Sequence, residues 1–290
     1  MEKIMTFTHK INRKKLTDAV IFNIILIAVS LIFLLPFFYM IFMSVMTNLE
    51  SVGNPKTIFF PRTWNWSNYA KAIDEDFLNW TVNTLIVIGV DIIAIPLSAS
   101  FCAFGFTRVK FAGRDKIFAF VLSTMMLPSI IVQVPLYVIF VKINWINTLL
   151  PLTVPAFLGG GAITIFLIKQ FMRSIPISLD EAATIDGANK FSIYFSIVLP
   201  LCKPILLFVM INTFMAGWND FSGPLMYLRH KDCYTLALGV YYKYAGKLSE
   251  SNFPNLQMAT GAIMVIPSAI IFFLFQRQLI DGVNIGSIKG

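Results

Sequence analysis

The chain has 290 residues, of which 57% are hydrophobic and only 13% are charged. Charged residues make up roughly a quarter of a soluble domain, so this composition excludes an ordinary soluble protein and indicates a chain that lies in lipid. The net charge of +8 does not predict nucleic-acid binding, because many of the lysines and arginines flank apolar runs, where the inner leaflet attracts them. The three cysteines, Cys102, Cys202 and Cys233, have no CxxC or other metal-ligand spacing, so no metal site is expected.

The apolar runs predict six membrane-spanning helices, because a span needs roughly 20 mainly apolar residues. In chain order these cover residues 19–46, 77–106, 118–141, 149–168, a fifth stretch that begins near Ile197 and ends before Asp220, and 257–275. The first run is too long for a secretory signal peptide and ends in bulky side chains, so it is expected to be retained. We therefore predict an all-α integral membrane protein, with a cytoplasmic amino-terminal segment at 1–18 and a single transmembrane domain at 19–290.

The distribution of basic residues predicts the orientation of the chain. Segments expected inside carry more lysine and arginine than those expected outside, which places both termini in the cytoplasm. The inner basic residues are Lys3, Lys10, Arg13, Lys14, Lys15, Arg108, Lys110, Arg114, Lys116, Lys169, Arg173, Lys190, Arg277 and Lys289. Two outer segments, 47–76 and 221–256, are long enough to contact a soluble partner.

Prolines and glycines inside the spans favour a bundle of bent helices over a simple anchor. Each proline frees a carbonyl group that must find another partner in lipid, and six lie within spans: Pro36, Pro96, Pro128, Pro135, Pro155 and Pro267. The run Gly159, Gly160, Gly161 permits either close helix contact or a break in the fourth span. The sequence does not decide between these two.

The inner loop between the fourth and fifth spans, residues 174–196, carries the most specific pattern in the chain. Ser178 followed by Glu181 predicts a capping box at the start of a helix. Acidic side chains at Asp180 and Glu181 also suit its first turn, where the helix dipole favours negative charge. Gly187 suits the left-handed position that closes a helix.

A helix of about two turns is too short to be stable alone, so this one needs a partner surface. The small side chains of Ala182 and Ala183 let such a surface approach closely. A second helix is predicted after it, because apolar residues recur at helical spacing, namely Phe191, Tyr194, Phe195 and Val198. Pro200 and Pro204 mark where the fifth span bends or begins. From the residues alone, an interfacial amphipathic loop without a docking role explains this segment equally well.

This loop resembles the EAA loop in the permease subunits of binding-protein-dependent importers. The resemblance rests on Glu181-Ala182-Ala183, Asp186-Gly187-Ala188, and Leu199-Pro200 with Pro204. It is closest to the carbohydrate-uptake branch, and to the maltose-type subunit with six spans. Weaker motifs extend it along nearly the whole chain: Asn68-Tyr69, Asn79-Trp80, Asn83-Thr84, Pro135-Leu136-Tyr137 and Gly217-Trp218-Asn219-Asp220.

The resemblance implies a type I importer permease fold, in a bacterial cytoplasmic membrane, that moves a carbohydrate such as an oligosaccharide by alternating access. It implies four kinds of partner: a second homologous permease subunit, two ATPase subunits, an extracytoplasmic solute-binding protein and membrane lipid. ATP and Mg²⁺ would be bound by the ATPase subunits, so no cofactor is expected on this chain. The short helix would insert into a cleft on an ATPase subunit, with Asp180, Glu181, Ala182, Ala183, Asp186 and Gly187 as the coupling residues.

Polar residues within the spans are candidates for the solute pathway, because polar groups in lipid often face a cavity. The candidates are Asn83, Asp91, Gln133, Tyr137, Asn212, Trp218 and Asn219. For each, a hydrogen bond between helices is the alternative, and the two aromatic side chains suit interfacial anchoring as well as stacking on a sugar ring. Asp91 also suits an ion- or proton-coupled carrier, although no second membrane-centred acid accompanies it in the sequence.

Other functions fit the sequence less well. A coupled carrier predicts an internal repeat and several membrane acids, and neither is evident. An enzyme is not expected, because no phosphate-binding loop, HExxH or GxSxG motif stands in the chain. Within the importer class, a sugar phosphate, a polyol or an acidic oligosaccharide remains an alternative cargo.

Overall fold

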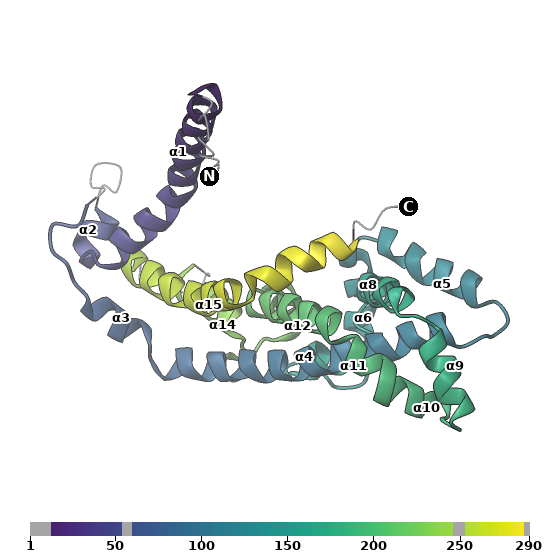
Figure 1. Ribbon diagram of the computed structural model, residues 1–290. Coiled ribbons are helices and arrows are strands. Elements are labelled where there is room, and N and C mark those ends of the chain that lie inside the picture. Colours follow the sequence, from purple (N-terminus) through teal and green to yellow (C-terminus); the bar gives the residue numbers. More distant parts are fainter. Residues whose placement is uncertain (1–12, 54–59, 246–252, 287–290) are drawn as a thin grey trace, which may run out of the picture. The chain divides into compact units, whose positions relative to one another are not determined.

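The computed structural model, shown in Figure 1, describes residues 13–53, 60–245 and 253–286. Its regular structure is helical, with no strand in those ranges. The chain divides into two compact units, one formed by residues 1–69 with 253–262 and the other by residues 70–252 with 263–290. Most of the predicted amino-terminal segment 1–18 lies outside the described residues, as do parts of both predicted outer segments.

The first unit contains the first long apolar helix and the loop that follows it. Its elements are α1 (Arg13–Ser44), α2 (Asn48–Val52), the start of α3 (Ser67–Ala72) and the start of α15 (Pro254–Gly286). The buried Asn68 amide donates to the carbonyl oxygens of Ser44 and Met46, both at 2.8 Å. These bonds satisfy carbonyl groups that the end of α1 leaves without a partner. One residue of a weak motif, Asn68, therefore fixes the chain after the first span.

The second unit is built around the long helix α4 (Glu75–Arg108), against which α8 and α12 pack. Asp74 caps α4, because its carboxylate accepts a hydrogen bond of 3.0 Å from the Phe77 amide. The remaining elements are α5 (Arg114–Ser123), η1 (Thr124–Met126), α6 (Ser129–Lys142), α7 (Leu150–Thr153), η2 (Val154–Leu158), α8 (Ala162–Ser174), α9 (Ser178–Ile185), α10 (Lys190–Ile193), the π turn η3 (Tyr194–Val198), α11 (Leu199–Leu201), α12 (Lys203–Trp218), α13 (Ser222–Tyr227), η4 (Lys231–Cys233) and α14 (Leu236–Tyr244).

The helices agree with the six spans predicted from the sequence. Four helical segments are long and apolar enough to cross a membrane: Val20–Ser44, Glu75–Arg108, Leu150–Ser174 and Pro254–Leu279. Two further pairs pass the same test but are bent, by 100° between Arg114–Met126 and Ile130–Lys142 and by 73° between Lys190–Leu201 and Lys203–Trp218. If each bent pair crosses once, the described residues contain six spans.

The glycine run in the fourth span forms both a break and a close contact. Gly159, Gly160 and Gly161 have φ values of 101°, 61° and 91°, which side chains with a Cβ rarely adopt. An added Cβ on Gly160 would also collide with the side chain of Ile95 on α4. The Ser98 hydroxyl accepts a hydrogen bond of 3.2 Å from the Gly159 amide, which supplies the broken backbone with a partner.

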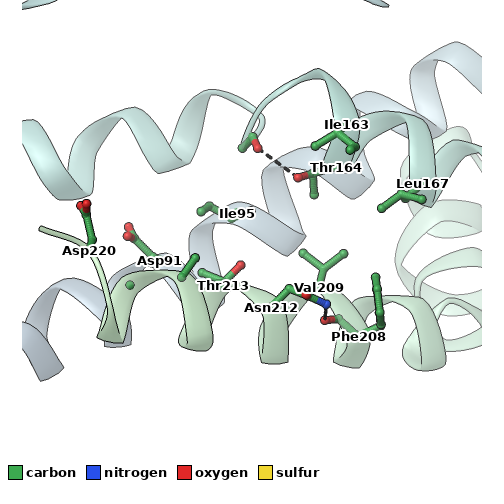
Figure 2. A pocket seen from close by; sticks show the side chains of 13 residues that line it. Asp91, Ile95, Ile163, Thr164, Leu167, Phe208, Val209, Asn212, Thr213 and Asp220 are labelled. Atoms are coloured by element: carbon green, nitrogen blue, oxygen red, sulfur yellow. Dashed lines mark hydrogen bonds between the residues drawn. The ribbon is translucent and has the colours of Figure 1, made fainter. Parts of the chain in front are cut away.

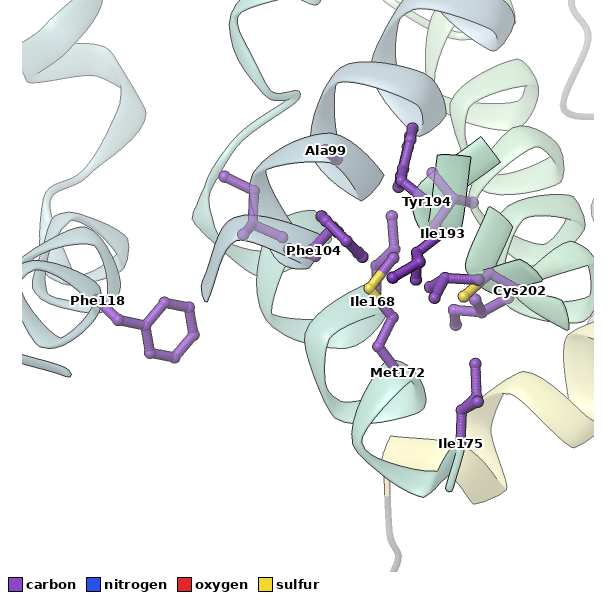
Figure 3. Close-up of a cluster of buried hydrophobic side chains, with 14 residues drawn as sticks. Ala99, Phe104, Phe118, Ile168, Met172, Ile175, Ile193, Tyr194 and Cys202 are labelled. Atoms are coloured by element: carbon purple, nitrogen blue, oxygen red, sulfur yellow. The ribbon is translucent and has the colours of Figure 1, made fainter. Parts of the chain in front are cut away.

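Two hydrophobic clusters hold the second unit together. The first contains Ile168 and Met172 from α8, Ile193 and Tyr194 from the segment after α9, and Phe104 from α4 (Figure 3). The second joins the start of α4 to the loop before α14, with Trp80, Trp218, Leu228, Leu236 and Leu238 among its buried members. The first cluster therefore fixes the loop around α9 against the transmembrane helices.

Candidate functional site

The start of α9 differs from the sequence prediction. Ile177 precedes the helix with a helical backbone (φ −69°, ψ −21°) and no side-chain cap is present. A capping residue needs an extended backbone, and Ser178 already lies inside the helix, so the predicted capping box is wrong. The amides of Asp180 and Glu181 instead donate to the carbonyl oxygen of Ile177, at 2.9 and 3.1 Å.

The end of α9 confirms the predicted closing glycine. Gly187 has a φ of +85°. The Gly187 amide donates to the carbonyl oxygen of Thr184 at 3.1 Å, and the Ala188 amide donates to that of Ala183 at 2.9 Å. This pair of bonds is the Schellman motif. The chain then turns directly into α10, whose first turn is capped by the Asn189 side chain at 2.9 Å from the Ser192 amide.

The two faces of α9 have different surroundings. Glu181 and Ala182 are exposed, as are Asp186 and Gly187 at the end of the helix. Ala183 packs against the first hydrophobic cluster, so a small side chain there lets the helix lie close to the spans. Of the six predicted coupling residues, only Asp180 is buried: it is turned inward and forms an ion pair with Arg108.

A groove of about 590 Å³ runs beside α9. It is lined by Arg108, Val109, Lys110, Ile177, Asp180, Glu181, Thr184, Ile185 and Lys190. Ile185 is 87% exposed at the tip of the helix. Figure 1 shows α9 and α10 projecting at the carboxyl-terminal end of α4. A projecting helix with an exposed apolar tip and a groove at its side is suited to insertion into a partner.

The predicted second helix is present, and its four apolar residues divide between a buried and an exposed side. Tyr194 and Val198 are buried, whereas Phe191 and Phe195 are 62% and 59% exposed. The turn over Tyr194–Val198 is a π turn, which is wider than an α-helical turn. The Tyr194 hydroxyl lies 2.7 Å from Oγ of Ser100 on α4.

A second candidate site is a cavity of about 560 Å³ between α4, α8 and α12 (Figure 2). Asp91 and Ile95 come from α4, Thr164 from α8, and Asn212 and Thr213 from α12. Most of the lining is apolar, with a few polar groups, as in sites for small molecules. No lysine or arginine lines this cavity in the part of the chain that the structure describes.

Asp91 has an acidic neighbour that the sequence order does not place beside it. Asp220, which follows α12, lines the same cavity, and both residues also line a smaller cavity of about 50 Å³. Oδ1 of Asp91 is buried and has no hydrogen-bond partner among the described residues. Asp220 stands 129 positions later in the chain, so its approach to Asp91 depends on how α12 packs on α4.

The other predicted pathway residues either lie outside this cavity or form hydrogen bonds to groups of their own helix or of a neighbouring segment. The Asn83 amide donates to the carbonyl oxygens of Asp232 and Tyr234, at 2.8 and 2.9 Å. Trp218 is buried and donates to the carbonyl oxygen of Met264 at 2.9 Å.

Tyr137 accepts a hydrogen bond of 2.8 Å from Arg229, and the exposed Asn219 donates to the carbonyl oxygen of Met215 at 2.8 Å. Gln133 is half-buried on α6 and does not line the cavity. Asn212 lines the cavity, although its amide donates to the Phe208 carbonyl of its own helix. Asp91 and Asn212 are thus the two predicted residues that the structure brings together.

Comparison with known proteins places these features in a family. The family model described as "Binding-protein-dependent transport system inner membrane component" matches residues 94–284, a range that includes α9 and most of the cavity. This match covers well over half of the chain.

Two curated relatives and one solved structure are similar over most of the chain. The arabinooligosaccharides transport system permease protein AraQ of Halalkalibacterium halodurans is 30% identical over 266 residues, covering 90% of this chain and 93% of that protein. The maltose/maltodextrin transport system permease protein MalG of Salmonella typhimurium is 32% identical over 219 residues, covering 73% of each. A bacterial ABC transporter involved in the import of the acidic polysaccharide alginate has a chain with a TM-score of 0.80 and 19% identity, covering 91% of this chain and 97% of that one. This likeness confirms the type I importer permease fold.

Proposed function

Because the chain belongs to the family of binding-protein-dependent transport system inner membrane components, we propose that it is one permease subunit of an ATP-driven carbohydrate importer. Two of its relatives are named as permeases for arabinooligosaccharides and for maltose and maltodextrin. These names support an oligosaccharide as the cargo. The subunit lies in the bacterial cytoplasmic membrane with both termini in the cytoplasm, as the basic residues predict.

The observation that carries this proposal is the projecting helix α9. It is short, its tip is exposed, and Gly187 closes it in a left-handed conformation. In the proposed mechanism an ATPase subunit receives the exposed face, which includes Glu181 and Ala182. Closure of the two ATPase subunits around ATP then moves α9, and the transmembrane helices alternate between inward-facing and outward-facing states.

The proposed complex contains a second homologous permease subunit, two ATPase subunits and an extracytoplasmic solute-binding protein. ATP and Mg²⁺ are bound by the ATPase subunits, and this chain holds neither. Many large apolar side chains on α6 are exposed, among them Ile130, Ile131, Val134 and Ile139. Lipid and the second permease subunit would cover such faces, because apolar surface of this extent is not left in water.

The cavity between α4, α8 and α12 is the proposed contribution of this subunit to the solute path. Carboxylate, amide and hydroxyl groups at Asp91, Asp220, Asn212 and Thr213 offer hydrogen bonds to sugar hydroxyl groups. The apolar remainder suits the C–H faces of a sugar ring.

Photocrosslinking in the assembled complex tests the docking role of α9. Benzoylphenylalanine in place of Ile185, which is 87% exposed, should crosslink to an ATPase subunit in proteoliposomes that import sugar. The same group in place of the exposed Lys142 at the end of α6, on the predicted outer side, should not. A complex that imports sugar but yields no ATPase crosslink from position 185 would contradict the assignment.

A further inference from the structure

Arg108, the last residue of α4, is the point where three helices meet. Its Nη2 group donates hydrogen bonds to the carbonyl oxygens of Met172 and Ile175 at the end of α8, at 3.3 and 2.8 Å. Its Nε lies 3.3 Å from Oδ2 of Asp180, in the first turn of α9. One planar guanidinium group therefore holds the ends of α4, α8 and α9 together, as its fork of donors allows.

The Arg108–Asp180 ion pair is almost fully buried. Its two side chains are 5% and 7% exposed. Oδ1 of Asp180 is also buried and accepts no hydrogen bond from the described ranges. Lys110 and Lys190 line the groove nearby, but both are exposed. The buried carboxylate thus depends on Arg108 for charge compensation, and removing only one partner would leave an uncompensated charge.

The pair connects α9 to the helix that lines the cavity. The same helix α4 that ends at Arg108 carries Asp91 and Ile95 into the cavity wall. A second contact, between Ser100 and Tyr194 at 2.7 Å, joins α4 to the segment after α9. A displacement of α9 therefore has a direct mechanical connection to α4, in addition to its chain connections to α8 and α12.

We propose that Arg108 and Asp180 are positioning residues that transmit the movement of α9 to α4. This inference rests on the proposed function, in which an ATPase subunit acts on α9. Asp180 holds α9 to the transmembrane helices and does not lie on the surface that the ATPase subunit receives. Glu181, one residue later, is exposed and faces the partner. Without the pair, α9 still docks and ATP is still hydrolysed, but less of the movement reaches the cavity.

The test uses the complete complex in proteoliposomes, with sugar uptake and ATP hydrolysis measured on the same vesicles. The informative variant is the double replacement Arg108→Gln/Asp180→Asn, because it removes the pair without leaving a buried charge. We expect this complex to assemble and hydrolyse ATP, while the sugar imported per ATP falls about tenfold, within the usual range for coupling between two sites. The single variants Arg108→Gln and Asp180→Asn break the same link but each leaves one buried charge, so each should lower this ratio at least as much as the double variant.

A matched control is available at the start of α5. Arg114 and Asp115 form a more exposed pair of the same chemistry, with Nε 3.1 Å from Oδ1 and side chains that are 29% and 78% exposed. The variant Arg114→Gln/Asp115→Asn should keep the wild-type ratio. An Arg108→Gln/Asp180→Asn complex with the wild-type ratio would overturn the inference and leave the pair a purely structural role. A wild-type complex that imports no sugar with ATP would instead refute the proposed function.

Discussion

Gly187 ends α9 with a φ of +85°, and nothing lies within 4 Å of the position that a Cβ would take. Backbone strain, rather than steric contact, therefore sets the effect of a substitution, at roughly 1–2 kcal/mol. We expect Gly187→Val to distort the turn between α9 and α10 and to lower import about tenfold, the factor that corresponds to 1.4 kcal/mol. ATP hydrolysis should persist, and sugar uptake and phosphate release from the same proteoliposomes measure both quantities.

Two variants control for this prediction. Gly187→Asn should retain most import, because asparagine enters the left-handed region far more readily than valine. Gly105→Ala should be tolerated, since Gly105 lies within α4 and an added Cβ meets nothing within 4 Å. Wild-type uptake by Gly187→Val would show that the turn is not needed for coupling.

Asp74 links α4 to α14 through an ion pair with Lys243. Burial raises the pKa of Asp74, but the hydrogen bond from Lys243 and that from the Phe77 amide outweigh it, so the pKa lies below its ordinary value of 3.8. A lowered pKa means that the pair stabilises the fold at neutral pH, and that this contribution is lost as the pH falls from about 5 through the folded-state pKa.

Asp74→Asn isolates this contribution, because asparagine remains a good helix cap but carries no charge. We expect the variant to unfold at a lower temperature than wild type at pH 7, with the difference shrinking as the pH falls below 5. Thermal unfolding in detergent at several pH values measures this. Glu75→Gln removes a charge from the next residue, which is exposed, and should change the unfolding temperature less. A difference that is constant with pH would contradict the ion-pair explanation.

The role of each residue on α9 was only partly predictable. The sequence pattern identifies the helix and its closing glycine, because both follow from local backbone chemistry. It does not reveal that Asp180 turns inward, since Arg108 stands 72 positions earlier and meets it only through the packing of α4 on α8. It also assigns a cap to Ser178, whereas the helix already includes Ser178 and the preceding residue, Ile177, has a helical backbone.

At the level of helices, α14 crosses α4 where Gly239 lies against Trp80. An added Cβ on Gly239 would overlap the indole ring, which is 3% exposed and donates to the carbonyl oxygen of Lys231 at 3.0 Å. We expect Gly239→Ala to lower the free energy of unfolding by about 1–3 kcal/mol, the usual effect of overpacking. Denaturant unfolding followed by tryptophan fluorescence measures the change.

Gly89→Ala is the matched control for this packing effect. Gly89 also lies in α4, and nothing stands within 4 Å of its added Cβ. Alanine is the better helix former by up to about 1 kcal/mol, so this variant should be neutral or stabilising. Equal destabilisation by both variants would show that the effect does not come from the Trp80 contact.

The number of spans was predictable because charge-free apolar runs report directly on lipid exposure. The breaks within the spans were less predictable from the sequence. Pro200 and Pro204 signalled the bend before α12, which the structure places at 73° between Leu201 and Lys203. The glycine run left a break and a close contact as alternatives, and both occur because α4 supplies Ser98 and Ile95 at that point. The π turn at Tyr194–Val198 had no local signal in the sequence.

For the molecule as a whole, Asp91 and Asp220 in one cavity raise the question of the energy source. Two carboxyl groups at one site repel each other when both are ionised, and paired acids occur on proton pathways. The same two groups also serve as hydrogen-bond acceptors for sugar hydroxyls. Membership of a binding-protein-dependent family favours the second role, and the two roles predict different requirements for transport.

Uptake with and without a proton gradient separates these roles. We expect proteoliposomes that contain the complex and internal ATP to import sugar in the presence of a protonophore, and to stop when a non-hydrolysable ATP analogue replaces ATP. The variant Asp91→Asn/Asp220→Asn should raise the sugar concentration for half-maximal uptake, because an amide replaces each carboxylate acceptor, while the requirement for ATP stays unchanged. Import that continues without ATP under an imposed proton gradient, and that this variant abolishes, would instead assign the two acids to proton coupling. That outcome would also make α9 irrelevant to the energy supply, so the Gly187→Val variant would then transport as well as wild type.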